Sequence, residues 1–197
     1  MTRLIVATGN RGKTKEINSI VADLGFEVSS LLDVENPPEI IEDGDTFEAN
    51  AVKKAQTVAD FYQCASLADD SGLVVDALDG APGVYSARYG GHGLNDTQRY
   101  EKLLDALKDV PAPRRTARFE CALAFVVPGD VPHIFRGTVE GHIALAPRGT
   151  NGFGYDPVFI PNGRSESMAE LDNAQKRQLS HRGQALDSFA AWLQKNK

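Results

Sequence analysis

The segment at residues 4–13 is the feature that most constrains the fold. Four apolar residues, 4–7, predict a short buried strand that runs directly into a loop containing two glycines, and apolar residues at helical spacing follow. A strand that passes through a glycine loop into a helix favours an α/β architecture. The helix start presents N–H groups and the positive end of the helix dipole, and Lys13 adds a mobile charge. The segment therefore predicts a site for a phosphate group.

The same stretch has two other interpretations. Residues 7–14 match the phosphate-loop pattern G-x-x-x-x-G-K-[ST], with Ala7 where the first glycine belongs. Gly12 and Lys13 also fit an ordinary helix start with a solvated lysine. A single local match does not decide among these alternatives, so the rest of the chain has to do so.

Size and charge narrow the possible partners. A chain of 197 residues is long enough to bury roughly 70% of the surface of the unfolded chain, and we expect one domain, 1–197, made of two lobes. The net charge of −6 disfavours a nucleic acid polymer, whose binding relies on many cationic contacts, but not a single nucleotide. No apolar run approaches the ~18 residues of a membrane span, and the two cysteines are far apart. We expect a cytoplasmic protein with no membrane contact and a small-molecule substrate.

Apolar periodicity predicts a mixture of helices and strands. Helices are expected directly after the first loop, from an N-cap at Asp45 to Tyr62, after an N-cap at Asn95, and after an N-cap at Ser180. Strands are expected at 26–31, 119–127, 134–144 and 158–160, with a hairpin turn at 128–130. Two short strands, 67–68 and 73–75, are expected to flank an acidic turn at 69–70. The predicted fold is an α/β fold in which helices flank an elongated mixed sheet, with an active-site groove between two lobes.

Asp69 and Asp70 are the first candidates for chemistry. In an extended chain adjacent side chains face opposite ways, so one carboxylate can face a site while its neighbour braces the backbone. Taken alone, the pair favours a plain Asx turn between two strands. The nearby phosphate-type loop favours the functional interpretation, because phosphate chemistry needs carboxylates to hold Mg²⁺.

Three further segments combine reactive or recognising side chains. The acidic loop 42–45 offers carboxylate oxygens, and Lys53 or Lys54 on the following helix could reach a phosphate, although solvated surface charge explains both. Phe153 lies between two glycines, where a ring can stand exposed and stack on a base or else plug the core. His181 and Arg182 fall in the first turn of a helix, where cations are unfavourable for the helix dipole and invite a functional explanation.

Six segments, in one order over nearly the whole chain, together resemble the Ham1/RdgB-type inosine triphosphate pyrophosphatases, and the bacterial branch of that family in particular. They are Thr8-Gly9-Asn10 with Lys13, Glu42-Asp43-Gly44-Asp45-Thr46-Phe47, Ala68-Asp69-Asp70-Ser71-Gly72-Leu73, Gly83-Val84-Tyr85-Ser86-Ala87-Arg88-Tyr89, Gly152-Phe153-Gly154-Tyr155-Asp156-Pro157 and Ser180-His181-Arg182-Gly183.

The resemblance implies a nucleoside triphosphate pyrophosphatase. It implies hydrolysis of dITP, ITP and XTP to the monophosphate and pyrophosphate, with Mg²⁺, by a homodimer that removes deaminated purines from the nucleotide pool. It also implies catalytic roles for Asp70, Lys13 and Lys54, with Asp70 as proton acceptor, and metal binding by Glu42 and Asp70. The substrate-binding residues that it implies are Thr8, Gly9, Asn10, Arg11, Gly12, Lys13, Ser71, Phe153, Gly154, Tyr155, Asp156, Lys176, His181 and Arg182.

Several alternatives stay open at this point. Asp43 and Asp45 rival Glu42 as the metal ligand, and Lys53 rivals Lys54, which is chosen for its spacing from residues 46–47. A phosphate-loop kinase or ATPase is the rival enzyme, and a nucleotide-sensing module without turnover is the rival of another class. No G-x-S-x-G segment occurs, which disfavours a serine hydrolase.

Overall fold

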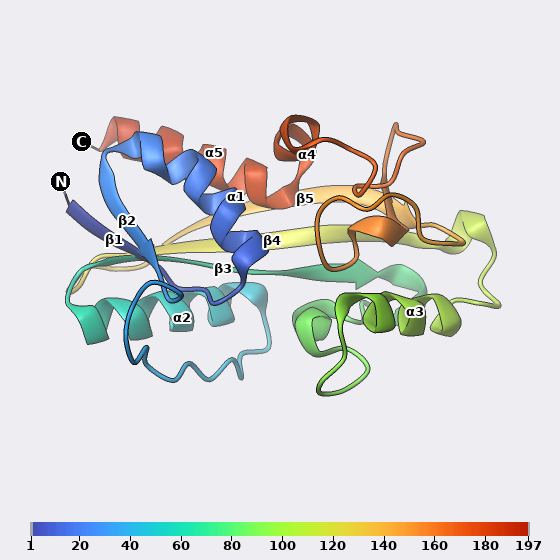
Figure 1. Cartoon of the computed structure of the whole chain (residues 1–197), viewed down its shortest axis with the longest axis horizontal. Coiled ribbons are helices and arrows are strands. Elements are labelled where there is room, and N and C mark those ends of the chain that lie inside the picture. The colour runs from blue at the N-terminus through green and yellow to red at the C-terminus, as the bar shows by residue number, and fades with distance from the viewer. Residues whose placement is uncertain (1, 197) are drawn as a thin grey trace. The chain divides into compact units, whose positions relative to one another are not determined.

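The computed structural model describes residues 2–196 and has an α/β fold. A six-stranded sheet has the order β2-β1-β3-β4-β5-β6 (Figure 1). The strand β1 pairs in parallel with β2 and β3, whereas β5 and β6 are antiparallel, so the sheet is mixed as predicted. The strands are β1 Thr2–Val6, β2 Phe26–Ser30, β3 Ala65–Val75, β4 Thr116–Val126, β5 His133–Ile143 and β6 Phe159–Pro161. The α-helices are α1 Arg11–Val21, α2 Phe47–Tyr62, α3 Asp96–Ala106, α4 Asn173–Leu179 and α5 His181–Lys195.

The chain forms two compact units. The first unit runs to Asp70 and also contains Cys121–Gly137 and the chain from Arg182 onwards. The second unit contains Ser71–Glu120 and Thr138–His181. The three long strands β3, β4 and β5 each contribute residues to both units.

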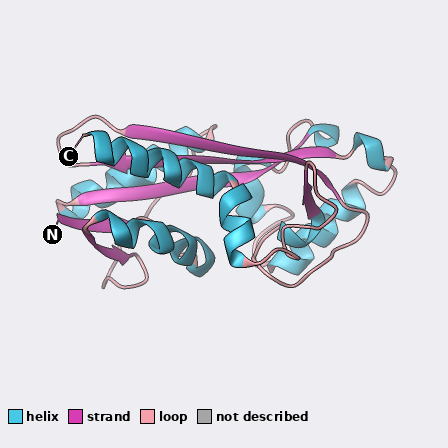
Figure 2. Ribbon diagram, turned by 90° about the horizontal axis from the view of Figure 1, so that it is seen from above, coloured by secondary structure: helices cyan, strands magenta, loops and turns pink. Residues whose placement is uncertain are grey.

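The first unit packs helices on both faces of its strands. The helices α1 and α5 lie on one face and α2 lies on the other (Figure 1), and Figure 2 views the molecule from the side of α1 and α5. The predicted apolar stripe of α5, which ends with Phe189 and Leu193, packs with Ile17 of α1 and with alternate residues of the central strands. The alternation follows from the two-residue period of a strand, which sends Leu4 and Val6 to this core.

The second unit has a core of its own. Apolar residues of β3 to β6 pack with Leu103 of α3 and with Leu107, the residue that caps the C-terminal end of this helix. The rings of Phe119 and Phe159 lie 4.7 Å apart between their centroids in a tilted arrangement. The helix α3 begins after Asn95, whose side chain accepts from the N–H of Gln98 while the Gln98 side chain accepts from the N–H of Asn95. The predicted cap at Asn95 is confirmed.

Two local predictions are wrong. Residues 69–70 form no turn, because β3 continues as one strand from Ala65 to Val75 with both aspartates in its middle. The pair can remain in the strand because cationic side chains surround each carboxylate, as described below. The cap of α2 is Thr46 rather than Asp45, since the Thr46 hydroxyl accepts from the N–H of Ala49. Both residue types cap well, and only the backbone conformation decides between neighbours.

The hairpin and the last strand follow the prediction. The strands β4 and β5 are neighbours in the sheet, and the chain turns between them at residues 127–130, where the N–H of Asp130 donates to the carbonyl of Val127. The strand β6 lies within one residue of its predicted range. Within residues 2–196 there is no helix with the length and apolar character needed to span a membrane.

Replacing the ring at the centre of the first core tests its packing. Phe189 is fully buried, with its ring 5.1 Å from that of Phe125 and 5.5 Å from that of Phe135 between centroids. We expect Phe189→Ala to lower the free energy of unfolding by about 3 to 5 kcal/mol, through lost burial and the cavity that remains. Urea denaturation followed by the fluorescence of Trp192, which packs against Phe125 and is the only tryptophan in the sequence, measures the loss.

The matched control is the adjacent exposed residue. Ser188→Ala removes only a hydroxyl that donates to the carbonyl of Gln184 on the helix surface. A loss in Phe189→Ala no larger than that in Ser188→Ala would contradict the described core.

Candidate active site

The loop that follows β1 forms a tightly bonded helix start. The side chain of Asn10 caps α1 by accepting from the N–H of Lys13 at 3.1 Å, and the Thr8 hydroxyl accepts from the N–H of Asn10 at 3.2 Å. Gly9 does not have a left-handed backbone, and a Cβ added there would meet no atom within 4 Å. The backbone of this loop is therefore open on one side, which suits the close approach of an anion.

Asp69 lies at the centre of a buried ion-pair cluster. Its Oδ2 accepts from Nε of Arg182 at 3.1 Å and from Nη2 at 2.9 Å, and Nζ of Lys13 lies 3.2 Å away. The guanidinium of Arg182 also donates to Glu16 on α1. Arg182 is itself buried, with 2% of its surface exposed, so it joins α5 to β3 and α1.

The charges around Asp69 keep it ionised. Burial alone would raise its pKa, but Arg182, Lys13 and Lys54 outweigh burial and hold the pKa far below its usual range. For the cationic Arg182 the effects are reversed. Burial alone would lower its pKa, but the carboxylates of Asp69 and Glu16 outweigh burial and raise it. Asp69 is therefore a permanent anion that holds its partners in place.

Asp70 faces a different set of partners. Its Oδ1 accepts from Nζ of Lys54 at 2.7 Å, and its Oδ2 accepts from Nδ2 of Asn50 at 3.3 Å. Both partners belong to α2, whereas the partners of Asp69 belong to α1 and α5. The adjacent carboxylates thus have separate partners on the two faces of β3, as the alternation of a strand predicts.

The structure distinguishes the neighbouring acids and lysines of this region. Lys54 is buried and its Nζ lies 2.9 Å from Oε2 of Glu42, so one ammonium contacts both Glu42 and Asp70. Lys53 instead pairs with Asp43, and both of those side chains are exposed to solvent. Of the candidates on the acidic loop, Glu42 is the one that the structure brings to Asp70.

Burial and the charges of neighbouring groups have opposing effects on the pKa values of Lys54, Asp70 and Glu42. Burial would lower the pKa of Lys54, but the carboxylates of Asp70, Asp69 and Glu42 outweigh it and raise that pKa. Burial and the nearby charge of Glu42 raise the pKa of Asp70 despite the Lys54 ammonium. For Glu42 the ammonium outweighs burial, so its pKa is lowered. Both carboxylates contact Lys54, yet the pKa of Asp70 is raised and that of Glu42 is lowered.

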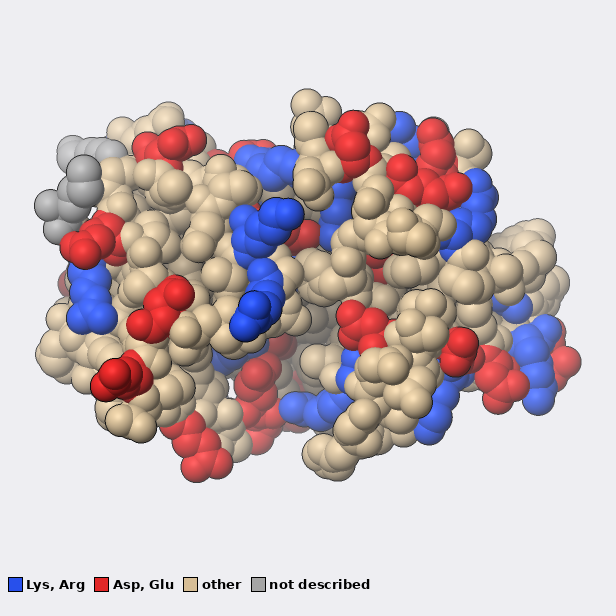
Figure 3. Space-filling model, viewed as in Figure 1, with Lys and Arg blue, Asp and Glu red and all other residues tan. Residues whose placement is uncertain are grey.

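Charged side chains also gather on the surface of this unit. Figure 3 shows Lys and Arg side chains over the first turns of α1, and Asp and Glu side chains along the loop that precedes α2. Arg11, at the first position of α1, is exposed, and Gly12 follows it in the same turn. The loop at 8–13 is therefore the positively charged part of the unit and the loop at 42–45 is the negatively charged part.

The second unit assembles another group of predicted residues. Oδ2 of Asp156 accepts from the N–H of Phe153 at 2.8 Å and from Nζ of Lys176 at 2.7 Å. The Lys176 ammonium also lies 4.7 Å from the centre of the Phe153 ring. Gly152 has φ +77°, and a side chain there would collide with the Asp156 carboxylate. The two glycines beside Phe153 thus allow a tight loop that a buried ion pair holds.

Neighbouring contacts fix the rest of this loop. The N–H of Gly154 donates to Oδ2 of Asp96, at the start of α3, at 2.7 Å. The hydroxyl of Tyr155 donates to the carbonyl of Ser86 at 2.9 Å, and burial raises the pKa of this phenol. The imidazole of His181 stacks on Phe119 with ring centroids 4.9 Å apart and planes 11° apart. Ser71, directly after Asp70 in β3, is partly exposed.

The sequence-based prediction missed residues that support the predicted ones. Asn50, Glu16 and Asp96 each hold a predicted site residue or loop, namely Asp70, Arg182 and Gly154. A signal existed for Asn50, because Asn50 and Lys54 are four residues apart and so share a helix face. No comparable signal exists for Glu16, whose partner is 166 positions away in the chain.

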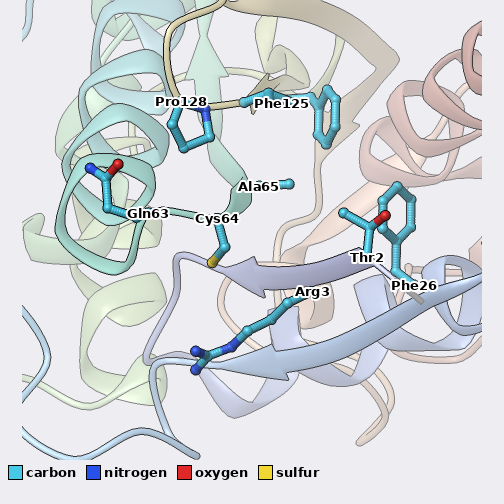
Figure 4. Close-up of a pocket in the computed structure, with 9 residues that line it drawn as sticks. Thr2, Arg3, Phe26, Gln63, Cys64, Ala65, Phe125 and Pro128 are labelled. Carbon is cyan, nitrogen blue, oxygen red and sulfur yellow. The ribbon is translucent and has the colours of Figure 1, made fainter.

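A separate pocket of about 580 Å³ lies in the first unit and contains none of the predicted residues. Its walls include Phe26, Phe125 and Pro128, with Arg3 and Cys64 beside them (Figure 4). No group of three or more His, Cys, Asp or Glu suited to hold a metal ion occurs among residues 2–196. Any metal bound at Asp70 and Glu42 would need further ligands from substrate or water.

Comparison with known proteins gives one consistent result. A family model described as the Ham1 family matches residues 4–192. The dITP/XTP pyrophosphatase of Geobacter sulfurreducens is 52% identical over 186 residues, which cover 94% of each chain. That of Oceanobacillus iheyensis is 49% identical over 194 residues, 98% of each chain. A solved HAM1 protein from Coxiella burnetii has a TM-score of 0.90 at 39% identity, covering 99% of this chain and 100% of its own.

Neutralising Asp69 should destabilise the protein in a pH-dependent way. Asp69→Asn removes one of the two carboxylates that pair with buried Arg182, and we expect a loss of about 3 to 5 kcal/mol in the free energy of unfolding at pH 7. The folded pKa of Asp69 is depressed, so its contribution is complete above the pKa of the unfolded state, about 3.9, and declines below it. The difference between wild type and variant should therefore shrink only below about pH 4.

Urea denaturation at several pH values measures this difference, with Asp60→Asn as the control, because Asp60 is exposed on α2. A constant difference between wild type and Asp69→Asn down to pH 3 would contradict the assignment.

Proposed function

We propose, starting from the fact that the chain belongs to the Ham1 family, that it hydrolyses the triphosphates of deaminated purines. The substrates are dITP, ITP and XTP, and the products are the nucleoside monophosphate and pyrophosphate. The single observation that carries the proposal is the pair of carboxylates, Asp70 and Glu42, on one buried lysine, in the same unit as an open glycine loop. Relatives whose sequences are 49% and 52% identical to this chain bear the name dITP/XTP pyrophosphatase, which supports this substrate class.

The loop at 8–13 binds the triphosphate in this proposal. Backbone N–H groups at the start of α1 and the helix dipole attract phosphate oxygens, and Gly9 allows them to come close. The side chains of Thr8, Asn10, Arg11 and Lys13 line the same loop. Lys13 stabilises the charge of the departing pyrophosphate, and its Nζ lies 3.2 Å from Oδ2 of Asp69. Lys54 supports the phosphates from α2.

Glu42 and Asp70 fit a magnesium ion. Mg²⁺ is commonly held by one or two carboxylates together with phosphate oxygens and water, so two carboxylates near one point are sufficient on the protein side. Both carboxylates contact one ammonium, Lys54 Nζ, which brings their oxygens near each other. When bound, Mg²⁺ would neutralise phosphate charge and orient the triphosphate.

Asp70 acts as the proton acceptor. Water attacks the anhydride between the α- and β-phosphates, a new P–O bond forms, the bridging P–O bond breaks, and pyrophosphate leaves while Asp70 takes the proton. A base needs a pKa near the working range, and burial shifts the pKa of Asp70 upward in that direction. Asn50 and Lys54 orient the carboxylate, and Ser71 follows it in β3 to contact the substrate.

The loop at 153–156 and Lys176 are the residues that we assign to the nucleoside. Phe153 offers a ring face to the purine, and Gly154, Tyr155, Asp156 and Lys176 form the loop and ion pair around it. Hypoxanthine and xanthine carry an oxygen at C6 where adenine carries an amino group. A donor such as His181 or Arg182 would give a hydrogen bond to this oxygen that the amino group of adenine would not accept, and the lost bond costs about 1 to 3 kcal/mol.

We extend the proposal to the setting of the enzyme. It works as a homodimer in the cytoplasm on small nucleotides, with no contact to a membrane or to polymeric nucleic acid. The net charge of −6 supports the last point, because a single nucleotide needs only a few local cations.

A hydrolysis panel with product identification tests the proposed function. Purified protein with Mg²⁺ and ITP, XTP, dITP, GTP or ATP is analysed for monophosphate, pyrophosphate and inorganic phosphate. We expect pyrophosphate from the first three substrates and a preference over ATP of about tenfold to hundredfold for each donor that discriminates. Inorganic phosphate from ATP would identify a phosphate-loop NTPase, and saturable ITP binding without any product would identify a sensing module.

Replacing the proposed base should stop turnover and preserve the fold. Asp70→Asn keeps the shape of the side chain and removes its charge, so we expect kcat for ITP to fall by about 10²-fold or more. Thermal unfolding checks that the variant is folded. Near wild-type activity in folded Asp70→Asn would mean that another group accepts the proton.

A pair of variants tests which acid holds the metal. We expect Glu42→Gln to raise the Mg²⁺ concentration needed for half-maximal rate by about tenfold or more, whereas Asp43→Asn, whose partner is exposed Lys53, leaves it unchanged. Magnesium titrations of the ITP reaction give both values. The reverse pattern would assign the metal to Asp43.

A further inference from the structure

We propose that Asn50 is a positioning residue that ties Asp70 to the acidic loop and so sets the geometry of the two carboxylates. The inference rests on the proposed function of this site, since it concerns the proposed base and metal ligands. Asn50 is not among the predicted site residues. Its side chain is fully buried, makes three hydrogen bonds and lies against Gly44.

Asn50 connects two parts of the chain through one amide group. Its side chain is fully buried in α2. The amide Nδ2 donates to Oδ2 of Asp70 at 3.3 Å and to the carbonyl of Gly44 at 3.2 Å, and Oδ1 accepts from the N–H of Gly44 at 2.8 Å. Both polar groups of the Gly44 backbone and one oxygen of Asp70 are therefore bound to the same side chain.

The second oxygen of Asp70 is also fixed from α2. Lys54, four residues after Asn50 on the same helix face, donates to Oδ1 while Asn50 donates to Oδ2. Each oxygen of the Asp70 carboxylate therefore accepts a hydrogen bond from a side chain of α2. These two bonds fix the orientation of the carboxylate plane as well as its position. Because Lys54 also donates to Glu42, the spacing of 50 and 54 on α2 aligns both carboxylates.

The glycine in the acidic loop makes this link possible. A Cβ at position 44 would lie 2.8 Å from Oδ1 of Asn50 and 2.9 Å from Cβ of Ala49, closer than such atoms approach. The backbone of Gly44 therefore lies against the amide with no room for a side chain. Since Glu42 is only two residues before Gly44, the position of this backbone limits where the Glu42 carboxylate can lie.

The consequence for function is specific. Because Asn50 is fully buried, we expect its replacement to leave the affinity for the nucleotide itself nearly unchanged. Without the Asn50 amide, the Asp70 carboxylate can rotate and the backbone at Gly44 can shift. Both changes disturb metal binding and the turnover step. Removing a residue that orients a metal ligand commonly costs about 10- to 100-fold in metal affinity or activity.

The experiment compares four proteins: wild type, Asn50→Ala, Gly44→Ala and Thr46→Ala. Gly44→Ala displaces the loop from the amide while Asn50 stays in place, so it tests the link through a residue on the loop rather than in the core. Thr46→Ala is the matched control, because it removes the cap of the same helix without touching the amide. Two readouts are taken: kcat and KM for ITP, and the dissociation constant for Mn²⁺ without nucleotide, by electron paramagnetic resonance.

We expect both link variants to show the same pattern. In Asn50→Ala kcat falls and the Mn²⁺ dissociation constant rises by about 10- to 100-fold, KM for ITP changes little, and Gly44→Ala gives a smaller change of the same kind. Thr46→Ala lowers the melting temperature and keeps the wild-type kcat and Mn²⁺ affinity. If Asn50→Ala does not fold, Gly44→Ala decides alone.

Other outcomes overturn the inference or separate it from the proposed function. Wild-type kcat and Mn²⁺ affinity in folded Gly44→Ala or Asn50→Ala would overturn it, and so would an equal loss in Thr46→Ala. A wild-type protein that does not hydrolyse ITP refutes the proposed function, and the Mn²⁺ affinities then still test the link. If the wild type hydrolyses ITP but binds no Mn²⁺ without nucleotide, the kcat values of the four proteins decide the inference.

Discussion

The neighbouring carboxylates of Asp69 and Asp70, both buried in the middle of β3, are the constraint around which the first unit is arranged. An ionised carboxylate inside a protein needs charged partners and hydrogen bonds, because its transfer from water is costly. A strand directs adjacent side chains to opposite faces, so one group of partners cannot serve both. The unit therefore supplies Arg182 and Lys13 on one side and Lys54 and Asn50 on the other.

The two sites differ in electrostatic balance, and this difference separates support from chemistry. Three cationic side chains, those of Arg182, Lys13 and Lys54, act on Asp69 and hold its pKa far below the usual range. Asp70 shares Lys54 with Glu42, so burial prevails and its pKa is raised. An adjacent pair of identical residues thus provides one fixed anion that joins α1 and α5 to the sheet, and one carboxylate with a raised pKa. The proposed reaction depends on this division.

The sequence predicts individual helices and strands better than the contacts between parts of the chain that are far apart in sequence. Periodicity identified the stripe of α5, the hairpin and the cap at Asn95, because each depends on residues near one another in the chain. The continuity of β3 was missed, since Arg182, which helps to stabilise Asp69 inside a strand, lies 113 positions away. Likewise the choice of Lys54 followed from spacing, whereas its contact with both Glu42 and Asp70 appears only in the folded chain. Long-range ion pairs carry no periodic signal.

The most direct test is a crystal structure of the protein with Mg²⁺ and an ITP analogue whose α–β bridge resists hydrolysis. We expect triphosphate oxygens within hydrogen-bonding distance of the loop at 8–13. We also expect a metal ion bound by Glu42 and Asp70, with the Asp69–Arg182 ion pair unchanged. A triphosphate bound away from this loop, or a metal ion held by Asp69 in place of Asp70, would contradict it.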